Sequence, residues 1–480
     1  MSEPDTKPHY ASAVFFAYSA SFAVGTAIGF AAPAQSEIEE NFPNIDYSLF
    51  GSLITVGALT GSLIAGVLVE RFGRVGTILF SCLFFTGGWI LILLRQNVEM
   101  LYLARFLLGS SAGINCMVIP IYISEITPAE RRGIYCTGHT LSIVVGILAI
   151  YVFGKKDWLR ATPLAFVCFL PTLATVLTMI FIPESPAWLM KQNSPKSMVS
   201  EALYFFFGRT AFAESQRELL MESKEGDGNN FSVAYLKDPA VLRPLLIALI
   251  LAGTQQACGI NAILFYTNEI FSSASRSIEP SIQVIIVGAV QVVFTFVAAL
   301  LIDRAGRRVL LLLSSTISLV GMLLLIAFYV LQEQKSPALD HLSWLPAISL
   351  SIFVAGFSVG LGPVPWLLMG ELLPVRARGV GVGLSVGFNS LCAFLVTKFF
   401  PNLMVKWGPS RAFSILAGVI AFSFVFVYFF VPETKNKTLE EIGAMFESRS
   451  RNGSRGNNDR SPSHASSVTD VPPRPDGHSA

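Results

Sequence analysis

The stretch Gly66-Val-Leu-Val-Glu-Arg-Phe-Gly-Arg74 separates two long apolar runs, and its pattern returns later in the chain as Ala299-Leu-Leu-Ile-Asp-Arg-Ala-Gly-Arg307. Two other motifs recur in the same order. Glu125-Ile-Thr-Pro128 with Arg132-Gly133 returns as Glu371-Leu-Leu-Pro374 with Arg378-Gly379, and Pro183-Glu184-Ser185 returns as Pro432-Glu433-Thr434. Three motifs repeated in one order predict a chain built from two related halves.

The composition is that of a membrane protein. Of the 480 residues, 52% are hydrophobic and only 14% are charged, whereas about 25% are charged in ordinary soluble domains. A soluble fold could not cover so much apolar surface with so few charges. The net charge is +2 and no basic stripe is present, which argues against nucleic acid as a partner. The six cysteines lie in apolar stretches without metal-ligand spacing, so we expect no metal site.

Apolar runs long enough to cross about 30 Å of hydrocarbon occur twelve times. The predicted spans are 12–33, 48–69, 76–94, 101–122, 134–153, 159–182, 244–267, 281–302, 309–331, 344–370, 380–400 and 411–431. The sequence therefore predicts an all-α membrane protein with twelve transmembrane helices in two pseudo-symmetric six-helix bundles. This is the parallel-repeat plan of one large class of transporters.

The spans divide the chain into five predicted regions: an N-terminus (1–11), a first bundle (12–182), a linker with short helices (183–243), a second bundle (244–431) and a largely disordered tail (432–480). An even number of spans leaves both termini on one side. The first outward loop, residues 35–47, has four acidic and no basic residues, and the two long segments on the opposite side, 183–243 and 432–480, each carry seven Lys or Arg residues. The distribution of positive charge favours cytoplasmic termini.

Further motifs follow one another in a fixed order: Arg105…Gly109…Gly113, Pro120-Ile-Tyr-Ile-Ser-Glu125, Pro183-Glu-Ser-Pro186, Gln255-Gln-Ala-Cys-Gly-Ile-Asn261, Gly362-Pro-Val-Pro-Trp366 and Pro432-Glu-Thr-Lys435. Together they resemble the sugar porter family of the major facilitator superfamily, over nearly the whole chain. Within that family, the chain is most similar to arthropod facilitated trehalose transporters, with class III facilitative glucose transporters close behind. The resemblance implies the major facilitator fold and sugar transport by alternating access.

Three amide side chains fall close together in the seventh span: Gln255, Gln256 and Asn261. One amide offers both a donor and an acceptor to a sugar hydroxyl. Gln256 and Asn261 are too far apart around a regular helix, but a local unwinding at Gly259 could bring them together. Polar residues in a span can also simply hold helices together. The resemblance implies that these three amides bind the substrate.

By resemblance, Asn389 and Trp366 join the substrate site from the second half. Trp366 follows Pro363 and Pro365, which cannot lie in an unbroken helix because proline lacks an N–H and clashes with the preceding turn. A span that bends there can swing the indole ring against a sugar. The other interpretation of Trp366 is an interfacial anchor.

Four positions depart from the family pattern. Thr140 stands where the family has a substrate-binding glutamine, and Gln291 stands where it has a pocket asparagine. Ser390 replaces a tryptophan and Ser358 replaces a glutamate found in some glucose carriers. The loss of a ring and an amide widens the site, which is compatible with a disaccharide.

The first span contains no acidic residue, since none occurs between Asp5 and Glu37. Proton-coupled members of the family place an aspartate where Ala31 stands, near the arginine that corresponds to Arg105. A proton relay in the membrane needs a titratable group, so the sequence predicts facilitated diffusion and a structural role for Arg105. A proton–sugar symporter and a non-transporting sugar receptor are the alternatives.

Charged residues of the repeated motifs are predicted to form a cytoplasmic network whose ion pairs join the two halves and act as a latch. The alternative is that the arginines only satisfy the positive-inside preference. The network comprises Glu70, Arg71, Arg74, Glu125, Arg132 and Glu184 in the first half, and Asp303, Arg304, Arg307, Glu371, Arg378 and Glu433 in the second.

No nucleophile–base pair or phosphate-binding loop is apparent, so we expect neither an enzyme nor a cofactor. The expected partners are a small-molecule sugar and the lipid bilayer, and the protein is expected to function as a monomer. The expected location is the plasma membrane, with an endosomal or lysosomal membrane as the alternative.

Overall fold

The computed structural model describes residues 8–128, 131–155, 159–208, 239–264, 280–335, 344–373 and 375–435, together with residues 337, 339, 342, 437, 442, 445 and 446. Of residues 239–240, 280–281 and 375–379 only the backbone is described. Most of the predicted linker and most of the tail lie outside these residues, as does the side chain of Arg378.

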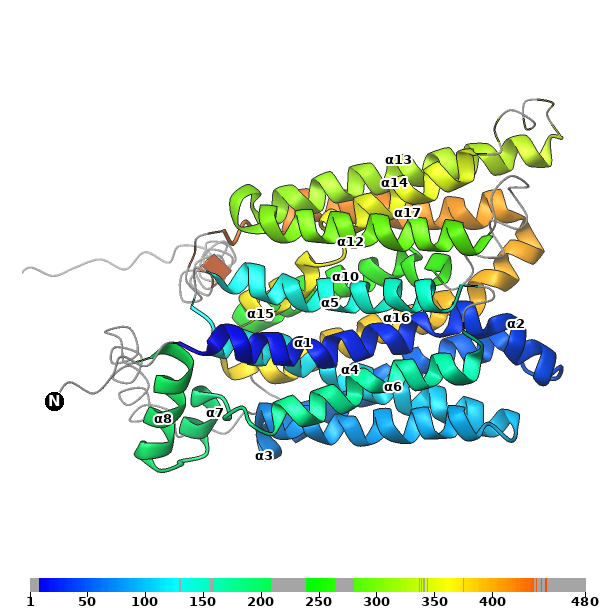
Figure 1. Cartoon of the computed structure of the whole chain (residues 1–480). Coiled ribbons are helices and arrows are strands. Elements are labelled where there is room, and N and C mark those ends of the chain that lie inside the picture. Colours follow the sequence, from blue (N-terminus) through cyan, green and yellow to red (C-terminus); the bar gives the residue numbers. More distant parts are fainter. Residues whose placement is uncertain are drawn as a thin grey trace, which may run out of the picture.

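The described chain is almost entirely helical, and its helices form two bundles (Figure 1). The first bundle contains α1 (Tyr10–Gly29), α2 (Ala31–Asn41), α3 (Tyr47–Leu94), α4 (Val98–Ile126), α5 (Arg132–Phe153) and α6 (Ala161–Met179). The second contains α10 (Pro239–Ala257), α12 (Pro280–Ala305), α13 (Arg307–Glu333), α14 (Leu345–Val359), α15 (Val364–Leu372), α16 (Val375–Trp407) and α17 (Pro409–Phe430). Two short helices, α7 (Pro186–Lys191) and α8 (Lys196–Phe207), lie at one end.

Eleven helices of the described chain are long and apolar enough to cross a membrane. One of them, α3, has 48 residues and contains two predicted spans, with a non-helical Gly73 between them. Gly57 and Gly88, on either side of Gly73, both pack against the middle of α4, so the chain reverses at Gly73. The predicted twelve spans are therefore accounted for.

The first span continues further than the sequence predicted. A helix, α2, follows the kink at Phe30 and runs through most of the expected outward loop. Ala34 and Ile38 are each about 1% exposed and belong to the main hydrophobic cluster. Burial of these side chains explains why a segment that is polar on its other face is helical.

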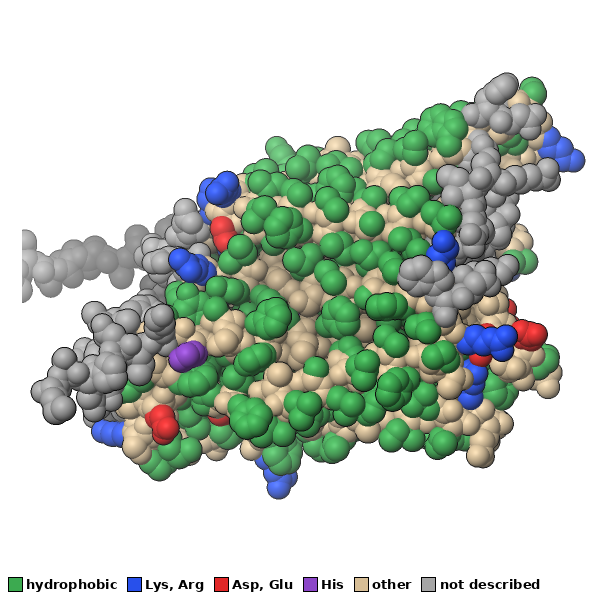
Figure 2. Space-filling model, viewed as in Figure 1, with side chains coloured by type: hydrophobic (Ala, Val, Ile, Leu, Met, Phe, Trp, Pro, Cys, Tyr) green, Lys and Arg blue, Asp and Glu red, His purple; other side chains and the backbone are tan. Residues whose placement is uncertain are grey.

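The surface of the bundles matches a bilayer environment. Large apolar side chains face outward on both bundles, among them Phe15, Val67, Leu177 and Phe429, which are 65 to 70% exposed. Figure 2 shows apolar side chains across the middle of the molecule and charged side chains gathered towards both ends. The protein is a multi-pass membrane protein.

Small residues bring the backbones of neighbouring helices close together. A Cβ atom on Gly57 or Gly61 of α3 would lie 2.0 to 2.1 Å from a carbonyl oxygen of α4. The reverse holds for Gly109 and Gly113 of α4, whose Cβ atoms would meet carbonyl oxygens of α3 at 2.0 and 2.1 Å. These contacts follow the small-xxx-small pattern of membrane helix pairs.

The two bundles meet along two helix pairs, α3 with α16 and α5 with α12. Figure 1 shows α5 beside α12. Gly387 of α16 contacts Leu59 and Leu63 of α3, and Gly288 of α12 contacts Leu148 and Tyr151 of α5.

Candidate substrate site

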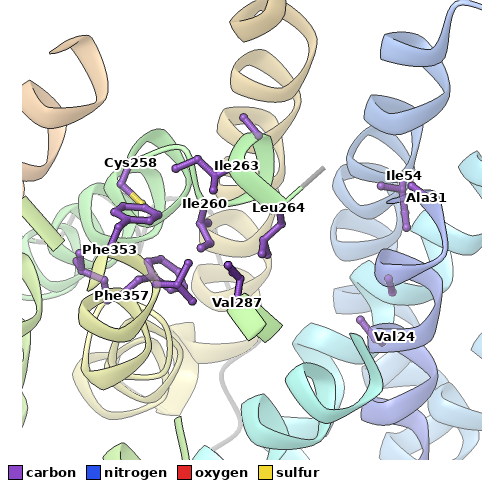
Figure 3. Packing of buried hydrophobic residues seen from close by; sticks show 14 of the residues in the cluster. Val24, Ala31, Ile54, Cys258, Ile260, Ile263, Leu264, Val287, Phe353 and Phe357 are labelled. Atoms are coloured by element: carbon purple, nitrogen blue, oxygen red, sulfur yellow. The ribbon is translucent and has the colours of Figure 1, made fainter. Parts of the chain in front are cut away.

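The predicted substrate site lies where α10 is interrupted. The helix ends at Ala257, Gly259 has a φ of +91°, and helical backbone resumes at residue 260. A Cβ at Gly259 would lie 2.4 Å from Leu416, so glycine is required there for both conformation and space. In Figure 3, Cys258 lies beside Phe353, and Ile260 beyond the break lies near Val287. The interruption redirects the chain and places Asn261 beside Gln256.

Four amide side chains form one hydrogen-bonded network across this break. Asn261 Nδ2 donates to Gln256 Oε1 at 2.8 Å, and Gln256 Nε2 donates to Asn389 Oδ1 at 3.2 Å. Asn389 Nδ2 in turn donates to Gln255 Oε1 at 2.7 Å and to the Ala252 carbonyl at 2.8 Å. Asn389 comes from α16, so the network joins two helices of the second half.

Gln255 also joins the network to the break between α14 and α15. Its Nε2 donates to the carbonyls of Leu361 and Gly362 at 2.9 and 2.6 Å, and its side chain is buried. Residues 360–363 are non-helical because Pro363 and Pro365 interrupt the hydrogen-bonding pattern. The amide of Gln255 therefore satisfies carbonyls that the break leaves without helical partners.

Trp366 lies half-buried on α15, immediately after this break. It lines a cavity of about 40 Å³ where α15 and α16 face α4 and α5. Arg132, Cys136 and Glu371 line the same cavity. A cavity of this size holds about three water molecules, and a hexose is several times larger. This cavity lies towards the end of the molecule that carries α7 and α8, which we call the α7–α8 end.

The remaining two predicted substrate residues lie outside the amide network. Gln291 of α12 is 5% exposed, and its Oε1 has no hydrogen-bond partner in the described part of the chain. Thr140 of α5 is half-buried. A buried amide oxygen without a partner costs about 1–3 kcal/mol. A hydroxyl group that donates to Gln291 Oε1 would remove this cost.

The repeated charged motifs form two similar clusters at the α7–α8 end. In the first half, Arg74 holds Glu125 through two hydrogen bonds of 2.6 and 2.8 Å, and Glu70 pairs with Lys191. In the second half, Arg307 lies 3.0 Å from Glu371 and 3.2 Å from Asp303. Ser185 and Thr434 donate to Glu125 and Glu371.

A second carboxylate in each cluster caps a helix. Glu184 accepts hydrogen bonds from the N–H groups of Arg74 and Val75, both at 2.9 Å, just after the positive φ of Gly73. Glu433 accepts from Arg307 and Arg308 at 2.9 and 3.1 Å, just after Gly306. Burial raises the pKa of Glu184, although these N–H groups and that of Ser185 lower it in part.

Among the described residues, the ion pairs at the α7–α8 end do not join the halves. Arg74, Lys191 and Arg307 each pair with carboxylates of their own half, while the side chain of Arg378 lies outside the described residues. The halves touch there through Asp303, whose Oδ1 would lie 2.2 Å from a Cβ on Gly133. Arg71 and Arg304 are exposed and form no ion pair with a described carboxylate.

At the opposite end, one ion pair does join the halves. Lys398 Nζ of α16 lies 2.7 Å from Asp46 Oδ2, and Asp46 Oδ1 accepts the N–H of Leu49 as the N-cap of α3. The sequence did not predict this pair. Asp46 stands before a long apolar run, which marks it as a helix cap, but nothing in the sequence connects it with a lysine 352 residues away.

The comparisons with known proteins agree with this architecture. The family model described as "Sugar (and other) transporter" matches residues 10–446. This chain belongs to that sugar transporter family. The bovine (Bos taurus) solute carrier family 2, facilitated glucose transporter member 8, is 36% identical over 461 residues, which cover 91% of this chain and 94% of that protein. The facilitated trehalose transporter Tret1 of Bombyx mori is 36% identical over 449 residues, which cover 92% of this chain and 87% of that protein.

The fold of this sugar transporter family member is also that of a solved major facilitator structure. The proton:xylose symporter XylE, bound to 6-bromo-6-deoxy-D-glucose, superposes with a TM-score of 0.79 at 22% identity, over 91% of this chain and 99% of that one. The twelve-helix major facilitator fold predicted from the sequence is confirmed. The protein is a transporter rather than an enzyme, as the sequence also predicted.

Arg105 lies fully buried in the first half of the transporter. Its NH1 donates to the Ala27 carbonyl at 2.7 Å and its Nε to the Phe50 carbonyl at 3.4 Å, and the guanidinium lies 5.0 Å from the centre of the Phe50 ring. No described carboxylate pairs with it. Its contacts are with α1 and α3, so Arg105 joins three helices of one half.

Proposed function

We propose that this protein carries trehalose, glucose or a related hexose across the membrane by facilitated diffusion. The observation that carries the proposal is the four-amide network at the break in α10, in which the half-buried amides of Gln256 and Asn261 lie beside the buried Asn389. Neutral amides exchange hydrogen bonds with sugar hydroxyls without the desolvation cost of a charge. The names of the relatives, a facilitated glucose transporter and a facilitated trehalose transporter, support this substrate class.

Gln255, Trp366, Gln291 and Thr140 complete the proposed site. Gln291 offers an unpartnered acceptor on α12, Thr140 a hydroxyl on α5, and Trp366 a ring beside the α14–α15 break. The sugar would then lie between the bundles and contact both. We assign the α7–α8 end to the cytoplasmic side and place the protein in the plasma membrane. We expect it to function as a monomer. The division into bundles 12–182 and 244–431 with the linker 183–243 is part of the same proposal.

The absence of proton coupling rests on the surroundings of Arg105. Ala31 offers no carboxylate at the family's coupling position, and carbonyl groups of α1 and α3 bind the guanidinium instead. A fixed cation without a titratable partner cannot exchange a proton with the transport cycle.

Sugar exchange in liposomes tests the proposal. The purified protein should equilibrate labelled trehalose or glucose with no pH gradient, and an imposed proton gradient should not concentrate the sugar. Accumulation driven by the gradient would identify a proton–sugar symporter. No exchange of any sugar in a panel of mono- and disaccharides would contradict transport, and a receptor would then be tested by deleting the tail beyond Ser448.

The Asp46–Lys398 ion pair is expected to hold the outer ends of α3 and α16 together. Asp46→Asn or Lys398→Gln should favour the state that is open at this end and lower the external KM by up to about fivefold, because exposed ion pairs contribute about 0–1 kcal/mol. The double variant should lower the KM no further than either single variant. Additive effects in exchange assays would show that the two side chains act separately.

The pKa of Asp46 determines how the Asp46–Lys398 ion pair depends on pH. Burial alone would raise the pKa of Asp46, but hydrogen bonds from Lys398 and the Leu49 N–H outweigh it and hold the pKa below its ordinary value. The stabilisation is therefore complete above the ordinary pKa of about 4 and is lost only as the pH falls through the lowered value. Between about pH 5 and pH 8 the Asp46→Asn effect on KM should be constant.

A further inference from the structure

The two halves build the same backbone frame at the α7–α8 end but place different charges on it. In each frame a glycine with positive φ, Gly73 or Gly306, precedes a helix whose first N–H groups bind a carboxylate, Glu184 or Glu433. Because the glycine, the start of the helix and the carboxylate correspond in the two halves, the residues of the two repeats can be aligned one by one. Where the first half has Val75 and Pro186, the second half has Arg308 and Lys435.

The extra cations of the second half have no carboxylate partner among the described residues. Arg308 NH2 donates to the carbonyl of Tyr428, and Lys435 Nζ donates to the carbonyl of Arg304 at 2.6 Å. The exposed Arg304 forms no ion pair either. The Glu433 carboxylate already accepts the N–H groups of Arg307, Arg308 and Lys435. Arg307 is paired with a carboxylate, as Arg74 is in the first half, so among the described residues of the second-half frame the cations without an ion pair are those that this half adds at positions 308 and 435, together with Arg304.

This cationic cluster, Arg304, Arg308 and Lys435, borders the lipid-facing surface. Tyr428, Phe429 and Phe430 at the end of α17 are 52, 70 and 59% exposed. The Arg308 guanidinium lies 5.7 Å from the centre of the Tyr428 ring. Exposed aromatic residues beside cations are typical of the level of lipid headgroups, where a phosphate group can approach cations that protein carboxylates leave unpaired.

We propose that the cationic cluster binds the phosphate of an anionic phospholipid in the leaflet at the α7–α8 end. The acyl chains would lie along the exposed apolar residues of α13 and α17, of which Val309 is 54% exposed. The first half has no equivalent site, since Val75 is buried and Pro186 carries no charge. The bound lipid would be held by one half only, and this proposal does not depend on which solute is transported.

Native mass spectrometry of the full-length protein tests the site. The protein is released from nanodiscs that contain equal amounts of phosphatidylglycerol and phosphatidylcholine, with no sugar present. Wild-type protein should retain phosphatidylglycerol preferentially. Arg308→Val, which copies the first half, should lower the preference about fivefold, and Arg308→Val with Lys435→Gln about 30-fold, because each cation near a charged membrane surface contributes about 1 kcal/mol.

Arg71→Gln is the matched control, because Arg71 is an exposed arginine at the position of the first half that corresponds to Arg304. It should leave the preference unchanged. An unchanged preference in the double variant, or an equal loss in Arg71→Gln, would overturn the proposal. So would displacement of phosphatidylglycerol by millimolar inorganic phosphate, because the occupant would then be a free anion. Arg308→Gln, which removes the charge but keeps an unbranched polar side chain, and a thermal unfolding curve for each variant separate lost binding from lost folding.

Discussion

Gly109→Ala is expected to prevent the first bundle from assembling. A methyl group at this position would lie 2.0 Å from the carbonyl oxygen of Ile54, a backbone atom that cannot move without separating α3 from α4. Overpacking typically costs about 1–3 kcal/mol and occasionally more, and we expect a cost at the upper end of this range because backbone must shift here. The variant should give little monodisperse protein in detergent, and what remains should unfold at a clearly lower temperature in a fluorescence-detected size-exclusion assay.

Gly51→Ala on α3 is the matched control, because a methyl group there meets nothing within 4 Å. Both changes replace a helical glycine by a better helix former, so their intrinsic effect on helix stability has the same sign. The control should fold as well as the wild type. A Gly109→Ala protein with wild-type yield and stability would mean that α3 and α4 do not pack as closely as the structure shows.

Asn389→Leu is expected to abolish sugar exchange, or to reduce it by at least about tenfold. Asn389 is the centre of the amide network, and its loss leaves Gln255 Oε1 and Gln256 Nε2 without the partner that Asn389 provides. Each unpartnered buried group costs about 1–3 kcal/mol, and the proposed hydrogen bond to the sugar is lost as well. Exchange rates in liposomes, normalised to the amount of folded protein, measure the effect.

Ser385→Ala on the same helix is the control for Asn389→Leu. Its hydroxyl donates only to the Gly381 carbonyl of its own helix, so its removal should change exchange by less than about twofold. Gln256→Ala and Asn261→Ala should each reduce uptake while folding persists. If Asn389→Leu, Gln256→Ala and Asn261→Ala all exchange sugar at the wild-type rate, the network only holds helices together.

The parts of the structure that the sequence predicted are governed by local patterns. The spans follow from apolar length, the two halves follow from three repeated motifs, and the interruption near Pro363 follows from two prolines. The break at Gly259 was inferred from one glycine between amides, and the structure has a φ of +91° there. The sequence did not predict the extension of the first span into α2, because Ala34 and Ile38 are apolar residues in a mostly polar segment. The helix is stabilised by the tertiary packing of these two side chains.

The charged residues show where local patterns are insufficient. The motifs indicate that Arg74, Glu125, Arg307 and Glu371 gather at one end, but not which carboxylate each guanidinium holds. In the structure the pairs of Arg74 and Arg307 each lie within one bundle, and the side chain of Arg378 lies outside the described residues, so a latch between the halves stays a prediction. Pairing depends on distances of a few ångströms between helices, and such distances are set by side-chain packing and helix crossing.

The sequence by itself determined that this protein lies in the membrane, that it has twelve spans in two related halves, and that it belongs with sugar transporters, since hydrophobic length and motif order are properties of the chain. Only the tertiary structure decided which amides meet, that Gln255 satisfies the carbonyls of Leu361 and Gly362, and that Asp46 pairs with Lys398. These partners are far apart in the sequence, and they come within hydrogen-bonding distance only through the packing of whole helices.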